Sequence, residues 1–218
     1  MSNSHPYESL TPDTVIDAVE STGVLTDLRI FPLNSYENRV YRVGLESGLN
    51  IVTESNGKIE VKKILQQLGN TKSLTHNTIH DIAESSDKEI WVATLGGGVS
   101  VFDLEGNFER SVKFGTVDLS DYSNKFVNAL HIDKTTVWLG TSDNGLLKYN
   151  TKSHSLEHYQ FEAGDSRSLL SNTIKKIYQD SKGQLWIATD KGLLIYNQIE
   201  NDFTRYVHSA TNPFSLSN

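Results

Sequence analysis

Hydrophobic and polar residues alternate with a period of two along most of the chain. The alternation is clear in IHDIAE, IWVAT, GVSVFD and NFERSV, and turn-forming Asp, Ser, Asn, Lys and Gly separate these segments. A period of two places successive side chains on opposite faces of an extended strand. The pattern therefore predicts short β-strands joined by tight turns.

This four-segment pattern is repeated. The three tryptophans of the chain are 47 and 48 residues apart, at Trp91, Trp138 and Trp186. An asparagine precedes each of them by 14 residues, at Asn77, Asn124 and Asn172. A fourth copy of the asparagine segment, SLSN, ends at Asn218. The period of 46 to 48 residues indicates a tandem repeat.

Two turns are expected within each repeat. The first spans Asp180 to Gly183, where glycine takes a positive φ at no steric cost, and we expect Asp87 and Asp133 to open the matching turns. The second turn is closed by a glycine in every repeat, at Gly98, Gly145 and Gly192. An aromatic residue ends the strand that follows, at Phe102, Tyr149 and Tyr196.

Four strands in each repeat of this length are typical of a β-propeller blade. We predict an all-β fold, an incomplete β-propeller of about three to four four-stranded blades, with a short α+β segment at its N-terminus. The repeat tryptophans are expected to fill the space between neighbouring blades. The predicted boundaries are residues 1–42 for the N-terminal segment, 43–70 for a partial blade, about 71–118, 119–165 and 166–211 for three blades, and 212–218 for the start of the next.

The N-terminal segment has a different character. Thr11 can cap a helix that begins at Pro12 and ends at Gly23, and two extended segments, LRIFP and NRVYRV, follow it. Aligning RVGLESGLNIV with WIATDKGLLIY puts Arg42 at the tryptophan position and Gly48 at the position of Gly192. We expect the strand through Val40 to join the partial first blade.

Composition narrows the classes of partner. The 218 residues include 27 acidic and 20 basic ones, a formal charge of −7, so the chain has no broad positive field for nucleic acid or anionic membranes. Cysteine is absent, which excludes disulfides and thiolate chemistry. The first twenty residues lack the pattern of a signal peptide, and we expect no membrane segment in this chain.

Candidate chemistry is sparse. His76 with His80, and His154 with His158, have a spacing that shares a metal on a helix, but on a strand it spans about 13 Å. The arginines show no repeated placement, and no carboxylate pair stands out as an acid and a base. We predict no catalytic residue, cofactor or metal. Ligand contacts, if present, are expected in the loops 111–124 and 161–169, whose simpler interpretation is a solvated linker.

The motif S-N-x-I followed by D-x-x-G-x-L-W-I-A-T-x-x-G-L-x-x-Y-N, from Ser171 to Asn197, resembles the two-component regulator propeller repeat. Two further copies begin at His76 and Ser123, and the resemblance covers about residues 43–218. In that family the repeats form periplasmic sensor domains of hybrid histidine kinases and of some diguanylate cyclases. The resemblance implies a non-catalytic signal-input module that binds a glycan or another small signal ligand in the periplasm.

The opening LTPDTVIDAVESTGV and PLNSYENRVYRV, within residues 1–46, is similar to the N-terminus of a bacterial stress-response kinase of aminoglycoside-phosphotransferase-like fold. The resemblance implies that the kinase loop near the phosphates corresponds to Asn34, Ser35, Tyr36, Glu37 and Asn38. No H-G-D motif follows, so phosphoryl transfer lacks its base. A kinase remnant, and a scaffold that self-associates through open blade edges, are the two alternative functions.

Overall fold

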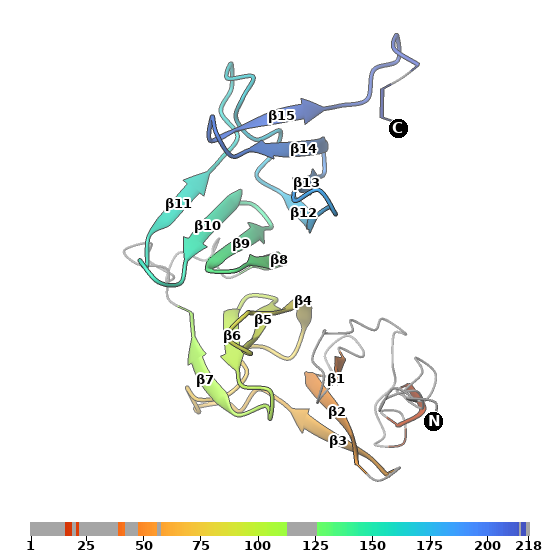
Figure 1. The fold of residues 1–218 in the computed structure, drawn as a ribbon, viewed down its shortest axis with the longest axis vertical. Helices are drawn as coiled ribbons and strands as arrows, with labels where there is room; N and C mark the ends of the chain where they lie inside the picture. Colours follow the sequence, from red (N-terminus) through yellow and green to blue (C-terminus); the bar gives the residue numbers. More distant parts are fainter. Residues whose placement is uncertain are drawn as a thin grey trace, which may run out of the picture. The chain divides into compact units, whose positions relative to one another are not determined.

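The computed structural model describes residues 16–18, 21, 39–41, 48–55, 58–112, 126–213 and 215–216 of the chain. Most of these residues form β-strands and the turns between them (Figure 1). The chain divides into two compact units, one of residues 1–94 and 99–112 and the other of residues 95–98 and 113–218. The predicted loop from Asn34 to Asn38 and the repeat residue Asn124 lie outside the described residues.

The first unit contains two antiparallel sheets. A three-stranded sheet has the order β1-β2-β3, and a four-stranded sheet has the order β4-β5-β6-β7. The strands of the first sheet are β1 (Arg39–Tyr41), β2 (Leu49–Ser55) and β3 (Lys58–Ile64). Those of the second are β4 (Ile79–Glu84), β5 (Ile90–Thr94), β6 (Gly98–Phe102) and β7 (Phe108–Ser111).

The second unit contains two four-stranded sheets, each a meander whose strands pair in chain order. The strands of one are β8 (Val127–Asp133), β9 (Thr136–Thr141), β10 (Leu146–Asn150) and β11 (Leu156–Tyr159). Those of the other are β12 (Ile174–Gln179), β13 (Leu185–Thr189), β14 (Gly192–Asn197) and β15 (Asp202–Tyr206). The all-β, propeller-type fold class predicted from the repeat is confirmed.

The three four-stranded sheets share one irregularity. In each of them the pairing of the first strand with the second shifts by one residue near its start, after Ile79, Val127 and Ile174. A bulge of this kind bends the strand and increases its twist. Because the bulge recurs at the same register, the three sheets are copies of one blade rather than three sheets of similar length.

The strand through Val40 pairs with β2, as the sequence predicted. Its register differs from the predicted alignment, because Val40 rather than Arg42 is the partner of Ile51. In the β12–β15 blade the residue corresponding to Ile51 is Ile195, which pairs with Trp186. The tryptophan position of the first sheet is therefore Val40. The segment between β1 and β2 is two residues longer than the matching turn, which a repeat alignment without gaps does not detect.

Ser85, not Asp87, opens the first turn of the β4–β7 blade. Its backbone exchanges hydrogen bonds with Glu89 and Lys88, as the backbone of Asp180 does with Gln184 and Gly183. The prediction for Asp87 was wrong because serine, like aspartate, accepts a backbone hydrogen bond in such turns, here from the N–H of Glu89. The predictions for Asp133 and for Gly183, which has a φ of 80°, agree with the structure.

Each unit buries its own apolar core. In the first unit the core joins the β1–β3 sheet to the β4–β7 blade through Leu49, Ile51, Leu74, Ile79, Ile82, Ile90, Val92, Phe102 and Leu104. In the second it joins the two blades through Ala129, Trp138, Leu146, Leu169, Ile174, Ile177, Leu185, Ile187, Leu194, Tyr196 and Phe203. Face-to-face packing of neighbouring sheets is thus the main source of stability in both units.

Candidate functional site

The repeat asparagines join successive sheets. The side-chain Oδ1 of Asn172 accepts a hydrogen bond from the N–H of Phe161 at 2.7 Å, and its carbonyl accepts one from the N–H of Gly145 at 2.8 Å. Asn77 makes the same two bonds with Gln66 and Gly48, at 2.7 and 3.0 Å. This side chain therefore holds the segment that leads into a blade against the blade before it.

The repeat glycines allow a close approach of backbone. Gly145 has a φ of 77°, and a Cβ built on it would lie 2.2 Å from the carbonyl oxygen of Tyr159. The same crowding occurs at Gly48 against Ile64 and at Gly192 against Tyr206. Only glycine fits these positions, because a side chain would collide with the end of the fourth strand. Gly98 also has a positive φ, of 72°.

A serine fixes the loop that leads from each blade to the next, which we call the linker loop. Ser168 Oγ accepts a hydrogen bond from the N–H of Glu162 and donates within the loop. Ser73 Oγ makes the matching contact with the N–H of Gln67, and Ser215 Oγ with that of Ser209. These serines are 95 and 47 residues apart, so Asn218 corresponds to Ser171 and not to the repeat asparagine.

The linker loop of residues 161–169 is anchored to the last strand of its blade. The guanidinium of Arg205 donates to the carbonyls of Asp165, Ser168 and Leu169 at 2.7 to 2.9 Å. Phe161 at the start of the loop is 43% exposed, and the ammonium of Lys191 lies 5.8 Å from its ring centroid. The structure thus gives this loop the contacts of a linker. The loop 111–124 lies almost wholly outside the described residues.

The three repeat tryptophans lie at equivalent positions with different neighbours. Trp91 is buried, and its indole N–H donates to Glu89 while the guanidinium of Arg110 lies over its ring. Trp138 is buried between the two blades of the second unit, with its ring centroid 4.7 Å from that of Tyr196. Trp186 is only half-buried, and its indole N–H donates to Asp180 at 3.0 Å.

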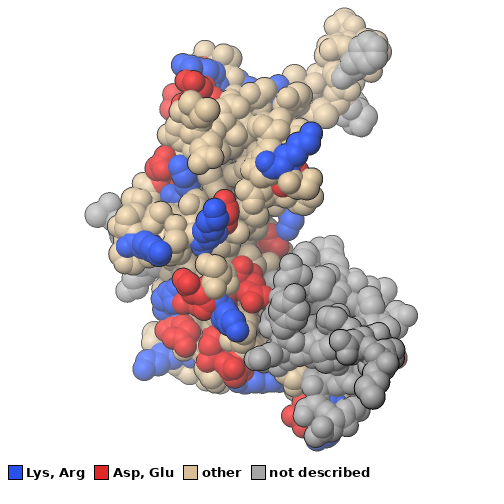
Figure 2. Space-filling view, in the orientation of Figure 1, with Lys and Arg blue, Asp and Glu red and all other residues tan. Residues whose placement is uncertain are grey.

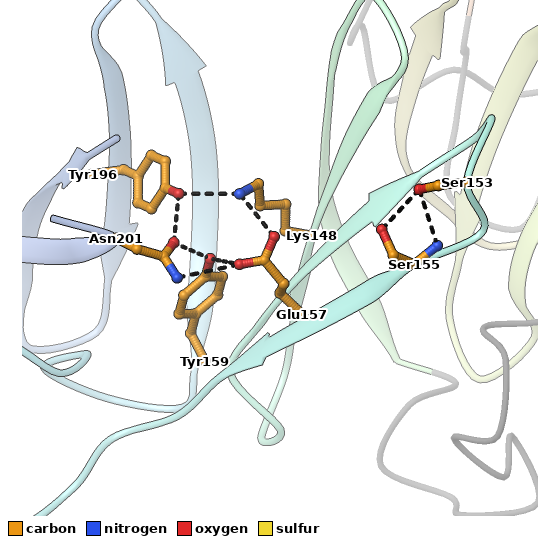
Figure 3. Close-up of polar contacts among 7 residues, drawn as sticks. All are labelled: Lys148, Ser153, Ser155, Glu157, Tyr159, Tyr196 and Asn201. Atoms are coloured by element: carbon orange, nitrogen blue, oxygen red, sulfur yellow. Dashed lines mark hydrogen bonds and ion pairs between the residues drawn. The ribbon is translucent and has the colours of Figure 1, made fainter. Parts of the chain in front are cut away.

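A polar network connects the two blades of the second unit beside Trp138 (Figure 3). Lys148 on β10 forms an ion pair with Glu157 on β11 at 2.9 Å and donates to the hydroxyl of Tyr196 on β14 at 3.1 Å. The amide Oδ1 of Asn201 accepts from both Tyr159 and Tyr196, at 2.6 and 2.7 Å. The network fixes how one blade meets the next.

The ionisation of this network follows from its contacts. Burial acts to lower the pKa of Lys148, but hydrogen bonds to Glu157 and Tyr196 outweigh it and leave the pKa above its ordinary value. Burial likewise opposes the bonds from Lys148 and Tyr159 that hold the pKa of Glu157 below its usual range. Burial, followed by the neighbouring carboxylate, raises the pKa of the Tyr159 hydroxyl. The network is therefore a charged pair capped by neutral tyrosines at neutral pH.

A groove of about 590 Å³ lies at one end of the two blades of the second unit. Its walls come from the turns that join β8 to β9, β12 to β13 and β14 to β15. Polar groups of several kinds line it, at Asp133, Thr136, Lys148, Gln179, Lys182, Gln184, Asn197, Gln198 and Glu200. We call this the turn groove. A smaller hollow of about 280 Å³ lies between the linker loop and β15.

The histidine pairs do not converge on a shared site. His154 Nδ1 bonds to the hydroxyl of Tyr149 at 2.8 Å, whereas His158 Nε2 bonds to the carbonyl of Asn144 at 2.6 Å. In the described part of the chain no three His, Asp or Glu side chains gather closely enough to hold a metal ion. On the face drawn in Figure 2, basic and acidic side chains are interspersed rather than segregated.

Meanders of four strands, joined by repeated asparagine, glycine and serine contacts, define the class of protein as a β-propeller repeat protein. Residues 73–96 and 168–191 match the family model described as the two component regulator propeller. The predicted resemblance to two-component regulator propeller repeats is confirmed. Among the described residues no helix has the length and hydrophobicity needed to span a membrane.

Relatives with these repeats are much longer. Histidine kinase P4 of Formosa agariphila is 33% identical in an alignment that covers 67% of this chain and 14% of that protein. Two solved extracellular domains of hybrid two-component systems of B. thetaiotaomicron share the fold. For BT3049 the TM-score is 0.65 at 21% identity, and for BT4673 it is 0.63 at 23% identity. The chain covers 24% and 22% of these two domains, which cover 83% and 84% of it.

A short stretch has relatives of another kind. Stress response kinase A of Escherichia coli K12 is 49% identical over 43 residues, which are 19% of this chain and 13% of the kinase. The serine/threonine protein kinase RdoA of Salmonella typhimurium is 45% identical over 40 residues. The predicted kinase resemblance is thus found, but the match is limited to a small part of both proteins.

Proposed function

We propose that this chain is the ligand-sensing, non-catalytic part of a signal-input propeller of a two-component system, acting in an extracellular or periplasmic compartment. The observation that carries the proposal is that the repeat residues are used as joints between sheets, as at Asn172 and Gly145. A scaffold held by repeated joints leaves the turns at the ends of its blades free to vary. The family match and the extracellular domains of similar fold support the same function.

The turn groove is our candidate for the ligand site. It presents amide, hydroxyl, carboxylate and ammonium groups together, and these groups hydrogen-bond the hydroxyls of a neutral glycan. Gln184 and Gln198 are exposed there on two different turns, so one ligand can contact both. The described residues with displaced pKa values in this region, Lys148 and Glu157, are paired with each other. We therefore propose recognition without turnover.

Titration calorimetry of the full chain against a panel of neutral oligosaccharides tests this proposal. We expect saturable binding of one glycan class, recovery of that glycan unchanged, and about a tenfold or greater loss of affinity in the Gln184→Ala, Gln198→Ala double variant. Gln160→Ala is the matched control, because Gln160 is exposed but bonds to Asn144 outside the groove. Binding that survives the double variant would place the ligand elsewhere.

The kinase alternative rests on the short match to stress response kinase A. It requires ATP hydrolysis that is abolished by substitutions within residues 34–38, whereas our proposal requires no hydrolysis. Self-association is a separate proposal, favoured by the outer strands β11 and β15, each of which pairs on one edge only within its sheet. The turn groove does not include these edges.

A further inference from the structure

One face of the β12–β15 blade carries exposed aromatic side chains. We define the Trp186 face by Lys176, Tyr178, Trp186, Ala188, Leu193 and Tyr206. Tyr178 is 62% exposed and Tyr206 is 42% exposed, and the first five of these residues line an apolar hollow of about 310 Å³. Aromatic side chains clustered at the surface of a blade mark a surface suited to a partner.

Strand pairing identifies the matching face of the preceding blade. Trp138 pairs with Lys148 and Gly140 with Leu146, as Trp186 pairs with Ile195 and Ala188 with Leu193. The first and fourth strands align in the same way. The residues that correspond to the Trp186 face are therefore Ala129, His131, Trp138, Gly140, Leu146 and Tyr159.

The structure shows what covers that matching face. A Cβ built on Gly140 would lie 2.4 Å from Cγ2 of Ile174, so the first strand of the next blade packs directly on the sheet. Tyr196 of its third strand contacts Trp138 edge-on at 4.7 Å. Phe203 of its fourth strand contacts Tyr159 at 5.3 Å. The occupant thus presents an isoleucine, a tyrosine and a phenylalanine from three strands.

The chain beyond β15 adopts the conformation that leads into a blade elsewhere in the molecule. Ser215 Oγ accepts from the N–H of Ser209 at 2.8 Å and lies 3.1 Å from its carbonyl oxygen. Ser168 makes the same two contacts with Glu162, at 2.9 and 3.3 Å, in the linker loop that precedes β12. This loop is a second observation, independent of the exposed aromatics, for a blade at the Trp186 face.

We propose that the Trp186 face is the docking surface of one further four-stranded blade of the same repeat, which follows the linker loop at Ser215. An apolar β-branched residue of its first strand packs against Ala188. An aromatic residue of its third strand contacts Trp186, and one of its fourth strand contacts Tyr206. Docking removes the three aromatic side chains of this face from water.

An extended chain provides the test. Because Asn218 corresponds to Ser171, a copy of residues 172–218 is joined directly after Asn218. The copy carries Trp186→Phe, so that the original Trp186 is the one half-buried tryptophan, Trp91 and Trp138 being 1% and 5% exposed. We expect acrylamide quenching of tryptophan fluorescence to fall at least about twofold relative to the unextended chain.

Ala188→Arg in the original blade is the matched variant, because it fills the place of the docking isoleucine while its side chain can extend into solvent in the unextended chain. It should restore the quenching of the extended chain and leave the unextended chain unchanged. Unaltered quenching on extension would overturn the proposal, whether the added copy folds or not. A dimer of the unextended chain that Ala188→Arg dissociates in sedimentation would show that a second copy, and not a further blade, occupies the face.

Discussion

At the scale of single residues, the repeat is maintained by positions where only one side chain satisfies the backbone. The asparagine at positions 77 and 172 needs a carbonyl oxygen on a short side chain to reach a backbone N–H of the linker loop. The glycine at positions 48, 145 and 192 needs the absence of a Cβ. Tryptophan is less constrained, since Trp91, Trp138 and Trp186 have different partners for the indole and ring.

Gly145→Ala is expected to destabilise the chain by about 3 kcal/mol, from left-handed backbone strain and collision with the carbonyl of Tyr159. Gly183→Ala should cost only about 1 kcal/mol, because its φ of 80° is similarly strained but no atom lies within 4 Å of the added Cβ. Lys88 occupies the position of Gly183 in the β4–β7 blade with a φ of 61°. Chemical denaturation of both variants measures the difference. Equal losses would mean that the close approach at Gly145 is not structurally important.

Residues that repeat could be predicted from the sequence, and residues that do not repeat could not. The periodic spacing of Asn172 and Gly145 marked them before the structure was known, although their roles as joints required coordinates. Lys148, Glu157 and Asn201 occur in one interface only, so no pattern identified them. Ser85 escaped prediction because it replaces the aspartate found at position 180.

At the scale of elements, the unit of organisation is a pair of neighbouring blades. Ile174, Leu185 and Phe203 of one blade pack against Ala129, Leu146 and Trp138 of the other within a single core. Strand number and order followed from the alternation of apolar residues. The first-strand bulges and the longer connection before β2 did not, because a register shift leaves the period of two unchanged on either side of it.

Lys148→Met is expected to weaken the joint between the blades of the second unit by about 1–2 kcal/mol, since Glu157 and Tyr196 lose a partly buried partner. Lys58→Met is the control and should give no measurable change, because both side chains of the Lys58–Glu60 pair are mostly exposed. Thermal denaturation of both variants measures the comparison. A loss for Lys58→Met as large as that for Lys148→Met would contradict the assigned role.

The same pair predicts a pH dependence. The pKa of Lys148 is raised in the folded chain, so its contribution is complete below the ordinary lysine pKa and is lost as pH rises through the raised value. The pKa of Glu157 is lowered, so its contribution is complete above the ordinary glutamate pKa and is lost as pH falls through the lowered value. The destabilisation caused by Lys148→Met should therefore be greatest between the two ordinary pKa values and smaller at both extremes.

At the scale of the whole molecule, the chain combines a repeat array with a short segment of different ancestry. The match to Histidine kinase P4 covers 67% of the chain, and that to stress response kinase A covers 19%. The strand β1 pairs with β2 although the predicted boundary at residues 42 and 43 falls between them. A strand needs only a free edge and a compatible register to join a sheet, so sequence similarity and sheet membership need not share a boundary.

The central claim is that tandem blades, each packed on its neighbour, form the scaffold of a sensing module. Hydrogen exchange followed by mass spectrometry tests it most directly, because the first strands of packed blades lie in the core and open only with the blade. We predict that the amides of β8 and β12 exchange together and are among the slowest in the second unit. Exchange of either strand at the rate of an unstructured peptide would contradict the account.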